Sequence, residues 1–254
     1  MTEFDERTGT ERENNNRRNF RVAIFGTARE DLTQDEESVY NAGLVAGAAV
    51  EQGFSIATGG YNQGVMRSAS VTAIKKAEEL GIRNPSEIVK AYPLAEELKG
   101  EIVSGAEITR SDTLAERLVN LIDKSDAFVV VGGKAGTVLE LMSALHSERV
   151  QRKMREKGGM ARPIIIIDPS MEHTDLLSLL ARRDKEFKSD ETLNEVYVLS
   201  HTEDMPEQIK EMLDLYYKKS QGETISEEAR SRLDRLSFNK FLDSQEHFTE
   251  GAGI

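Results

Sequence analysis

The sequence predicts an α/β protein in which a mostly parallel β-sheet carries helices on both faces. Short apolar runs alternate with amphipathic stretches from residue 20 to residue 218. Several of these runs are apolar throughout, as in Ile164-Ile165-Ile166-Ile167, which is typical of strands buried on both sides. Two of the runs lead directly through glycines into a helical pattern. Together these observations favour a doubly wound, Rossmann-like fold.

The composition limits the possible classes of protein. The 254 residues suffice for one α/β domain with a good core, or for two small domains at most. No apolar run approaches the roughly 20 residues that span a bilayer, and the N-terminus lacks the apolar segment of a signal peptide. The net charge of −12 argues against a nucleic-acid-binding surface. The absence of cysteine excludes disulfides and thiolate chemistry and fits a cytoplasmic location.

The first half of the chain contains strands and helices in alternation. Residues 20–25 form an apolar run with strand character, and residues 35–52 carry apolar side chains at helical spacing. A second strand is expected at 54–58. A helix follows from residue 64 to residue 80, where Gly81 ends it.

The middle of the chain repeats this order with shorter strands. Residues 87–92 form a third strand, which Pro93 ends, and residues 106–109 form a short fourth strand. A helix is expected over residues 111–124, because Ser111 or Asp112 can cap its first turn.

The second half completes the sheet. Residues 127–131 and 163–168 are apolar strands, and the helix between them is expected at 137–157. A helix at 171–183, a strand at 196–199 and a helix at 203–218 follow.

The chain divides into three parts on composition. Residues 1–19 are polar and are expected to form a disordered tail. Residues 20–219 form the Rossmann-like domain. Residues 220–254 are a C-terminal extension, with one helix expected at 226–242 followed by an acidic tail.

Two glycine loops are the strongest functional signal. The first contains Gly59, Gly60 and Gly64, and the second contains Gly132, Gly133 and Gly136; each follows a predicted strand and precedes a predicted helix. Free backbone N–H groups and the positive end of a helix dipole meet at such a turn, which makes an anion site. The alternative is a strand-to-helix turn that binds nothing.

Thr137 and Glu140 follow the second loop and allow two interpretations. The Thr137 hydroxyl can bond a phosphate oxygen cradled by the N–H groups after Gly133. Thr137-x-x-Glu140 also has the spacing of a capping box, in which both side chains only close the helix N-terminus. The two roles are compatible.

Arg117 is the third candidate. It lies at the edge of the apolar stripe of its helix, so its guanidinium is expected to be partly buried and to need a carboxylate or phosphate partner. The alternative is a stem that packs on the sheet with its head in solvent. The four histidines show no metal-ligand spacing, so no metal site is expected.

Taken together, these motifs resemble the Lonely Guy (LOG) family, whose members were long mislabelled as lysine decarboxylases. The resemblance rests on Gly59 to Met66, on Arg117 followed by Asp126-Ala127-Phe128, and on Gly133 to Glu140, and it covers roughly residues 20–216. Three positions depart from the family pattern, which has a proline, a glycine and a lysine where this chain has Gly132, Lys134 and Leu118.

The resemblance implies a cytokinin riboside 5′-monophosphate phosphoribohydrolase, which cleaves the N-glycosidic bond of AMP or N6-substituted AMP without a metal or cofactor. Glu140 would then stabilise the oxocarbenium-like state or orient the attacking water, and Arg117 would orient Glu140 or contact the ligand. The resemblance also implies a homodimer. The residues expected to hold the substrate phosphate are Gly59, Gly60, Gly133, Gly136 and Thr137. The alternative is a nucleotide or phosphorylated-ligand binding or carrier protein, because related carrier and nucleotide-sensing proteins share the fold without this hydrolysis.

Overall fold

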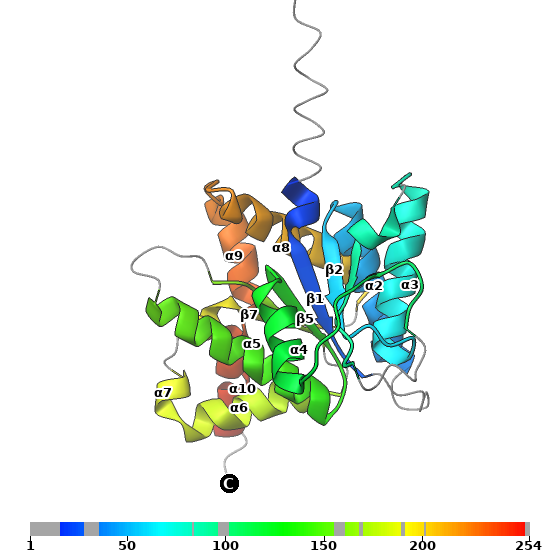
Figure 1. Cartoon of the computed structure of the whole chain (residues 1–254). Helices are drawn as coiled ribbons and strands as arrows, with labels where there is room; N and C mark the ends of the chain where they lie inside the picture. The colour runs from blue at the N-terminus through cyan, green and yellow to red at the C-terminus, as the bar shows by residue number, and fades with distance from the viewer. Residues whose placement is uncertain are drawn as a thin grey trace, which may run out of the picture.

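The computed structural model describes residues 16–27, 36–82, 84–95, 102–154, 161–167, 170–188, 191–200 and 202–251. Its centre is a seven-stranded sheet in which every pairing is parallel (Figure 1). The strands are β1 Arg21–Phe25, β2 Ser55–Thr58, β3 Val89–Ala91, β4 Glu107–Ile108, β5 Ala127–Val131, β6 Ile164–Ile167 and β7 Val196–Leu199. This confirms the predicted α/β class.

The strand order is β4-β3-β2-β1-β5-β6-β7. The chain therefore runs outward from β1 to β4, and returns to the other side of β1 with β5. In open α/β sheets ligands bind beyond the carboxyl ends of the strands, at the point where the order reverses. That point lies here between β1 and β5, which pair from Val22↔Ala127 to Phe25↔Val130.

Helices cover both faces of the sheet (Figure 1). The helices are α2 Glu36–Glu51, α3 Gly64–Glu79, α4 Leu114–Asp123, α5 Ala135–Met154, α6 Glu172–Arg183, α7 Lys185–Lys188, α8 Met205–Ser220, α9 Glu227–Leu236 and α10 Phe238–Gly251, with 3₁₀ helices η1 Pro85–Glu87 and η2 Glu191–Glu195. Alternate strand residues point to opposite faces, so Val129 packs in the core beneath α2, α3 and α8, while Val130 packs beneath α4, α5 and α6. Two separate core clusters, one on each face, make the fold doubly wound.

The C-terminal extension differs from the prediction. A single helix was expected at 226–242, whereas the structure has α9 and α10 separated at Ser237. Ser237 has extended backbone angles and forms an antiparallel bridge with Tyr197 of β7. A residue that pairs with a strand cannot continue a helix, so the bridge divides the helix and covers part of the β7 edge.

The N-terminal region also differs from the prediction at its end. Residues 16–19 are helical, although residues 1–19 were expected to be disordered. Arg17 is held there by an ion pair with Asp214 at 3.1 Å, and its guanidinium lies over the Tyr217 ring. Residues 1–15, and the predicted strand end at Asp168, lie outside the described residues.

In the described part of the chain, no helix combines the length and the apolar character that crossing a membrane requires.

Candidate functional site

Both predicted glycine loops lie at the carboxyl edge of the sheet, on either side of the switch point. Gly59 and Gly60 follow β2, and Gly132 and Gly133 follow β5, the strands that flank β1. Gly133 has a φ of 106°, which favours glycine, and a Cβ there would lie 2.1 Å from the Thr137 hydroxyl oxygen. The turn after β5 therefore depends on glycine to bring the start of α5 close to the strand.

Gly59 makes room for Arg117. A Cβ at Gly59 would lie 2.2 Å from the Arg117 Nη2 atom and 2.7 Å from the Met66 sulfur. The guanidinium therefore packs directly against the backbone of the first loop. This contact joins the loop after β2 to α4, which lies next to β5 in the sequence.

Two polar contacts also hold Arg117 in place. Its Nε donates a hydrogen bond to the Tyr92 carbonyl at 3.0 Å, and its Nη2 lies 3.3 Å from Oε1 of Glu140. The Arg117 and Glu140 side chains are only 11% and 5% exposed. The expectation of a partly buried guanidinium with an anionic partner is confirmed, and the alternative with the head in solvent is wrong.

Burial controls the charge of Glu140. Loss of solvent raises the pKa of this carboxyl from its usual value near 4.5 to about 7, and the neighbouring Arg117 charge partly opposes the rise. Glu140 therefore gains and loses a proton near neutral pH. Carboxyls that do so at the edge of a ligand site are suited to acid–base or electrostatic roles.

The capping-box interpretation of Thr137 and Glu140 is wrong. The helix α5 begins at Ala135, and the Lys134 carbonyl already accepts the Val138 N–H at 3.0 Å. Thr137 therefore lies inside the first turn rather than before it, and Glu140 contacts Arg117 instead of closing the helix. Gly136 lies in the same first turn, and within the part of the chain that the structure describes, no atom outside its own turn comes within 4 Å of the position that a Cβ would occupy.

Several supporting residues escaped the sequence analysis. The Thr58 hydroxyl accepts the Gly60 N–H at 3.1 Å, and the Tyr61 hydroxyl accepts the Leu94 N–H at 3.4 Å. The Arg117 guanidinium lies 6.0 Å from the centre of the Tyr61 ring. Tyr61 lies within the first glycine loop, so its position beside the site could have been predicted from the sequence. The backbone carbonyl of Tyr92 could not, because a backbone group leaves no signal in the sequence.

The site has no metal centre among the residues described: they contain no group of three His, Cys, Asp or Glu side chains that could hold an ion.

Comparison with known protein families identifies the family of this chain. A family model described as the SLOG cluster4 family matches residues 19–172, which is more than half of the chain. The chain belongs to the SLOG cluster4 family. This family is part of the LOG-like superfamily, so the resemblance seen in the sequence is confirmed at that level. The match contains both glycine loops, Arg117 and Glu140, while β7 and α8 to α10 of this SLOG chain lie beyond it.

Two solved structures share the fold of this SLOG chain. One is the molybdenum cofactor binding protein from the phototrophic bacterium Rippkaea orientalis, at 18% identity and a TM-score of 0.54, covering 77% of this chain and 98% of that one. The other is the molybdenum cofactor carrier protein from Chlamydomonas reinhardtii, at 18% identity and a TM-score of 0.52, covering 78% and 99%. None of the curated proteins matches the sequence. At this identity the likeness concerns the fold alone.

Proposed function

We propose that this chain hydrolyses the N-glycosidic bond of a nucleoside 5′-monophosphate, either AMP or an N6-substituted AMP, to the free base and ribose 5-phosphate. The observation that carries the proposal is the Arg117–Glu140 pair, buried at the carboxyl edge of the sheet between two glycine loops. The reaction needs a group that holds the substrate phosphate and a carboxylate near the ribose. The glycine turn would provide the first and Glu140 the second.

The phosphate would bind at the start of α5. This helix has 20 residues, and its first turn offers the N–H groups after Gly133 together with the Thr137 hydroxyl. Among the described residues, no protein group hydrogen-bonds this hydroxyl, which leaves it available to a ligand. None of the described residues outside this turn fills the space beside Gly136, and Gly59 and Gly60 would face the ligand from the loop after β2.

Glu140 would act on the ribose carbon. As the bond from the anomeric carbon to the base nitrogen breaks, positive charge develops on the sugar, and an ionised Glu140 would stabilise it. The same carboxylate can accept a proton from the water that adds to that carbon, while the departing base takes up a proton at its nitrogen. Arg117 would keep Glu140 oriented, and its charge favours the ionised form.

A second function, ligand binding without catalysis, is favoured by a specific observation. The Glu140 side chain is 5% exposed and already paired with Arg117, so it would need to be uncovered to meet a sugar. The two solved structures with the same fold are named for binding or carrying the molybdenum cofactor. We therefore keep a nucleotide or phosphorylated-ligand binding or carrier protein as the alternative.

Incubation with AMP and N6-substituted AMP distinguishes the two functions. We expect free base and ribose 5-phosphate in equal amounts from the wild-type protein, and far less from the Glu140→Gln variant. Saturable AMP binding by folded protein, without release of base, would instead support the alternative. If AMP is neither bound nor cleaved, the proposed hydrolysis is contradicted, and so is the alternative as far as it concerns this nucleotide.

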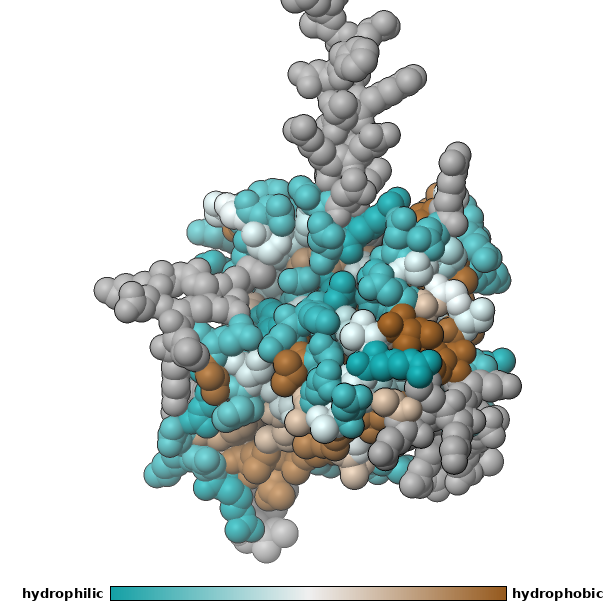
Figure 2. Space-filling model, in the orientation of Figure 1, coloured by the Kyte–Doolittle hydropathy of each residue, from teal (hydrophilic) through white to brown (hydrophobic). Residues whose placement is uncertain are grey.

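We also propose that the chain forms a homodimer, as the resemblance implies. Three leucines of α4, α5 and α6, the helices that cover one face of the sheet, remain 42–51% exposed, namely Leu114, Leu139 and Leu179. Figure 2 shows apolar surface gathered on this face. A second copy would remove this area from water.

A further inference from the structure

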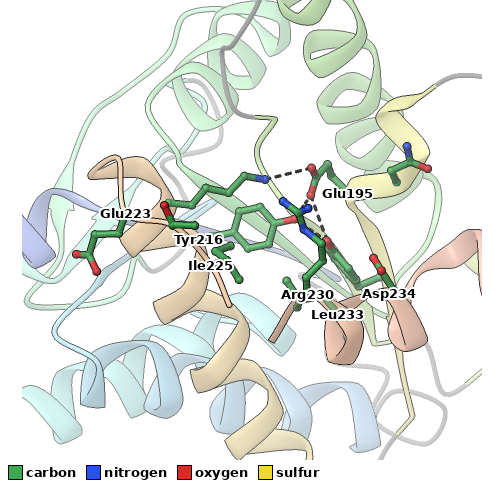
Figure 3. Close-up of a pocket in the computed structure, with 11 residues that line it drawn as sticks. Glu195, Tyr216, Glu223, Ile225, Arg230, Leu233 and Asp234 are labelled. Carbon is green, nitrogen blue, oxygen red and sulfur yellow. Dashed lines mark hydrogen bonds and ion pairs between the residues drawn. The ribbon is translucent and has the colours of Figure 1, made fainter. Parts of the chain in front are cut away.

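A cavity of about 360 Å³ lies between α8, α9 and η2 (Figure 3). It opens beside Glu195 and Tyr197 at the amino end of β7, and so lies at the opposite edge of the sheet from Arg117 and Glu140. Its α9 wall comes from the C-terminal extension, beyond the segment that matches the SLOG family. The cavity is therefore separate from the proposed nucleotide site.

The floor of the cavity is a closed polar network. The Tyr197 and Tyr216 hydroxyls lie 2.6 Å apart, and both bond one oxygen of the Glu195 carboxylate. Lys219 approaches the other oxygen at 3.4 Å. Burial raises the pKa of Tyr197 above its usual value, so this hydroxyl stays neutral. The polar groups of the floor bond one another, so the side chains of the walls are the ones left to recognise a ligand.

The α9 wall offers one cation and one anion. Arg230 and Asp234 are four residues apart and line the cavity from the same side of the helix. In Figure 3, Arg230 points toward Glu195 and the hydroxyl end of Tyr216. Within the described part of the chain, neither Arg230 nor Asp234 forms an ion pair. By contrast, Arg232 on the same helix pairs with Glu211 at 2.9 Å.

The lining carries both positive and negative side chains, which favours a ligand that also carries both charges over a simple ion. An isolated anion would be attracted by Arg230 and Lys219 but repelled by Asp234 and Glu223, and an isolated cation would meet the reverse. A molecule that carries a positive and a negative group a short distance apart can pair with both kinds of lining side chain. Ile225 and Leu233 add an apolar wall, and the volume lies in the range of small-molecule sites, roughly 300–1,000 Å³.

We propose that this cavity binds a small zwitterion of the α-amino-acid class. The ligand carboxylate pairs with the Arg230 guanidinium, which donates two parallel hydrogen bonds to such a group. The ligand ammonium pairs with Asp234, and an apolar ligand side chain lies against Ile225 and Leu233. This inference does not depend on the proposed hydrolysis.

The test begins with the twenty standard amino acids, each added to the full-length protein in a thermal-unfolding assay. Binding is then measured by calorimetry with leucine and with two matched probes: isocaproate, which lacks the ammonium group, and isoamylamine, which lacks the carboxylate. We expect saturable binding of leucine at one site per chain, with each probe at least about tenfold weaker because one charged contact is lost.

Variants of the cavity residues test whether leucine binds in this cavity. Arg230→Gln and Asp234→Asn are expected to weaken leucine binding about tenfold or more. Arg235→Gln, an exposed arginine on the same helix outside the cavity, is expected to leave it unchanged. The proposal is overturned if no amino acid stabilises the protein, if isocaproate binds as well as leucine, or if the cavity variants bind like the control. AMP turnover is measured in parallel, so that failure of the proposed function is seen separately.

Discussion

Arg117 and Glu140 form an ion pair at 3.3 Å although their side chains are 11% and 5% exposed. Such a pair does little for the stability of a protein on balance, because two charges lose their hydration when they are buried. Losing only one partner is far more costly. The pair joins the end of β3, the loop after β2, α4 and α5, so it fixes the geometry of the whole site.

Replacing Arg117 should therefore destabilise the fold. Arg117→Met keeps most of the stem but leaves the Glu140 carboxyl buried without its cation. We expect a loss of about 2–4 kcal/mol in the free energy of unfolding, below the upper range for broken buried pairs because Glu140 can take up a proton. Chemical denaturation measures this loss. The exposed Arg110→Met serves as the control and should change stability by less than about 0.5 kcal/mol.

Combining Arg117→Met with Glu140→Gln tests whether the cost comes from the pair. The double variant should be more stable than the sum of the two single losses predicts, by about 1–3 kcal/mol. Simple additivity would show that the two side chains do not interact in solution.

The raised pKa of Glu140 predicts how stability changes with pH. The folded protein holds a proton on Glu140 up to about pH 7, while the unfolded chain releases it near its usual value of 4.5. The native state therefore binds more protons between these values, and stability should fall as pH rises through that window. The shift corresponds to at most about 3 kcal/mol.

Comparison with Glu140→Gln isolates this effect from other titrating groups. Denaturant unfolding at pH 5 and pH 8 should show a larger loss for the wild type than for the variant. An equal loss in both proteins would mean that Glu140 titrates near its ordinary value.

The proposed dimer predicts a mass of twice the 28.3 kDa chain. Burying the exposed side chains of Leu114, Leu139 and Leu179 provides the driving force. Light scattering at micromolar concentration measures the mass, and Leu139→Glu should shift it toward the monomer. A wild-type value near 28 kDa would refute the dimer.

The sequence was informative where local patterns decide structure. The apolar runs and glycine turns predicted the strands, because a buried parallel strand and a strand-to-helix turn each leave a short local signature. Arg117 was predicted to need an anionic partner from its place on the helix stripe. The residues alone left its partner open between a carboxylate and a phosphate, because residues 117 and 140 meet only through the packing of α4 and α5. The family resemblance gave Glu140 as one of two possibilities, the other being the ligand.

Two predictions failed because a tertiary contact outweighed local spacing. Thr137-x-x-Glu140 has the capping-box pattern, yet α5 begins two residues before Thr137, and Glu140 pairs with Arg117. The helix expected at 226–242 is interrupted because Ser237 pairs with Tyr197 of β7. Neither long-range partner is visible in the local pattern.

Two glycines of the second loop should respond oppositely to alanine. Gly133→Ala forces a side chain into a φ of 106° and within 2.1 Å of the Thr137 hydroxyl, so we expect a loss of about 1–3 kcal/mol. Gly136→Ala lies inside a helix, and among the described residues no atom outside its own turn comes within 4 Å of the added methyl group. Stability should therefore be unchanged or raised by up to about 1 kcal/mol.

Ligand binding by the stable Gly136→Ala variant tests the phosphate site. If the phosphate occupies the open space beside Gly136, the added methyl group should weaken AMP binding by roughly tenfold. Calorimetry with AMP measures this. Unchanged affinity would place the phosphate elsewhere.

The last prediction concerns the role of Glu140 in turnover. Glu140→Gln preserves the shape of the side chain but removes the negative charge that would face the developing positive charge on the ribose. The turnover number should fall by roughly 10²-fold or more, the usual scale for one preorganised electrostatic group, while AMP affinity changes little. Since only the ionised carboxylate can act, wild-type turnover should rise with pH through about 7, where Glu140 loses its proton. The residual activity of the variant should show no such rise. Hydrolysis by Glu140→Gln at the wild-type rate would remove Glu140 from the mechanism and leave the glycine loops as a binding site.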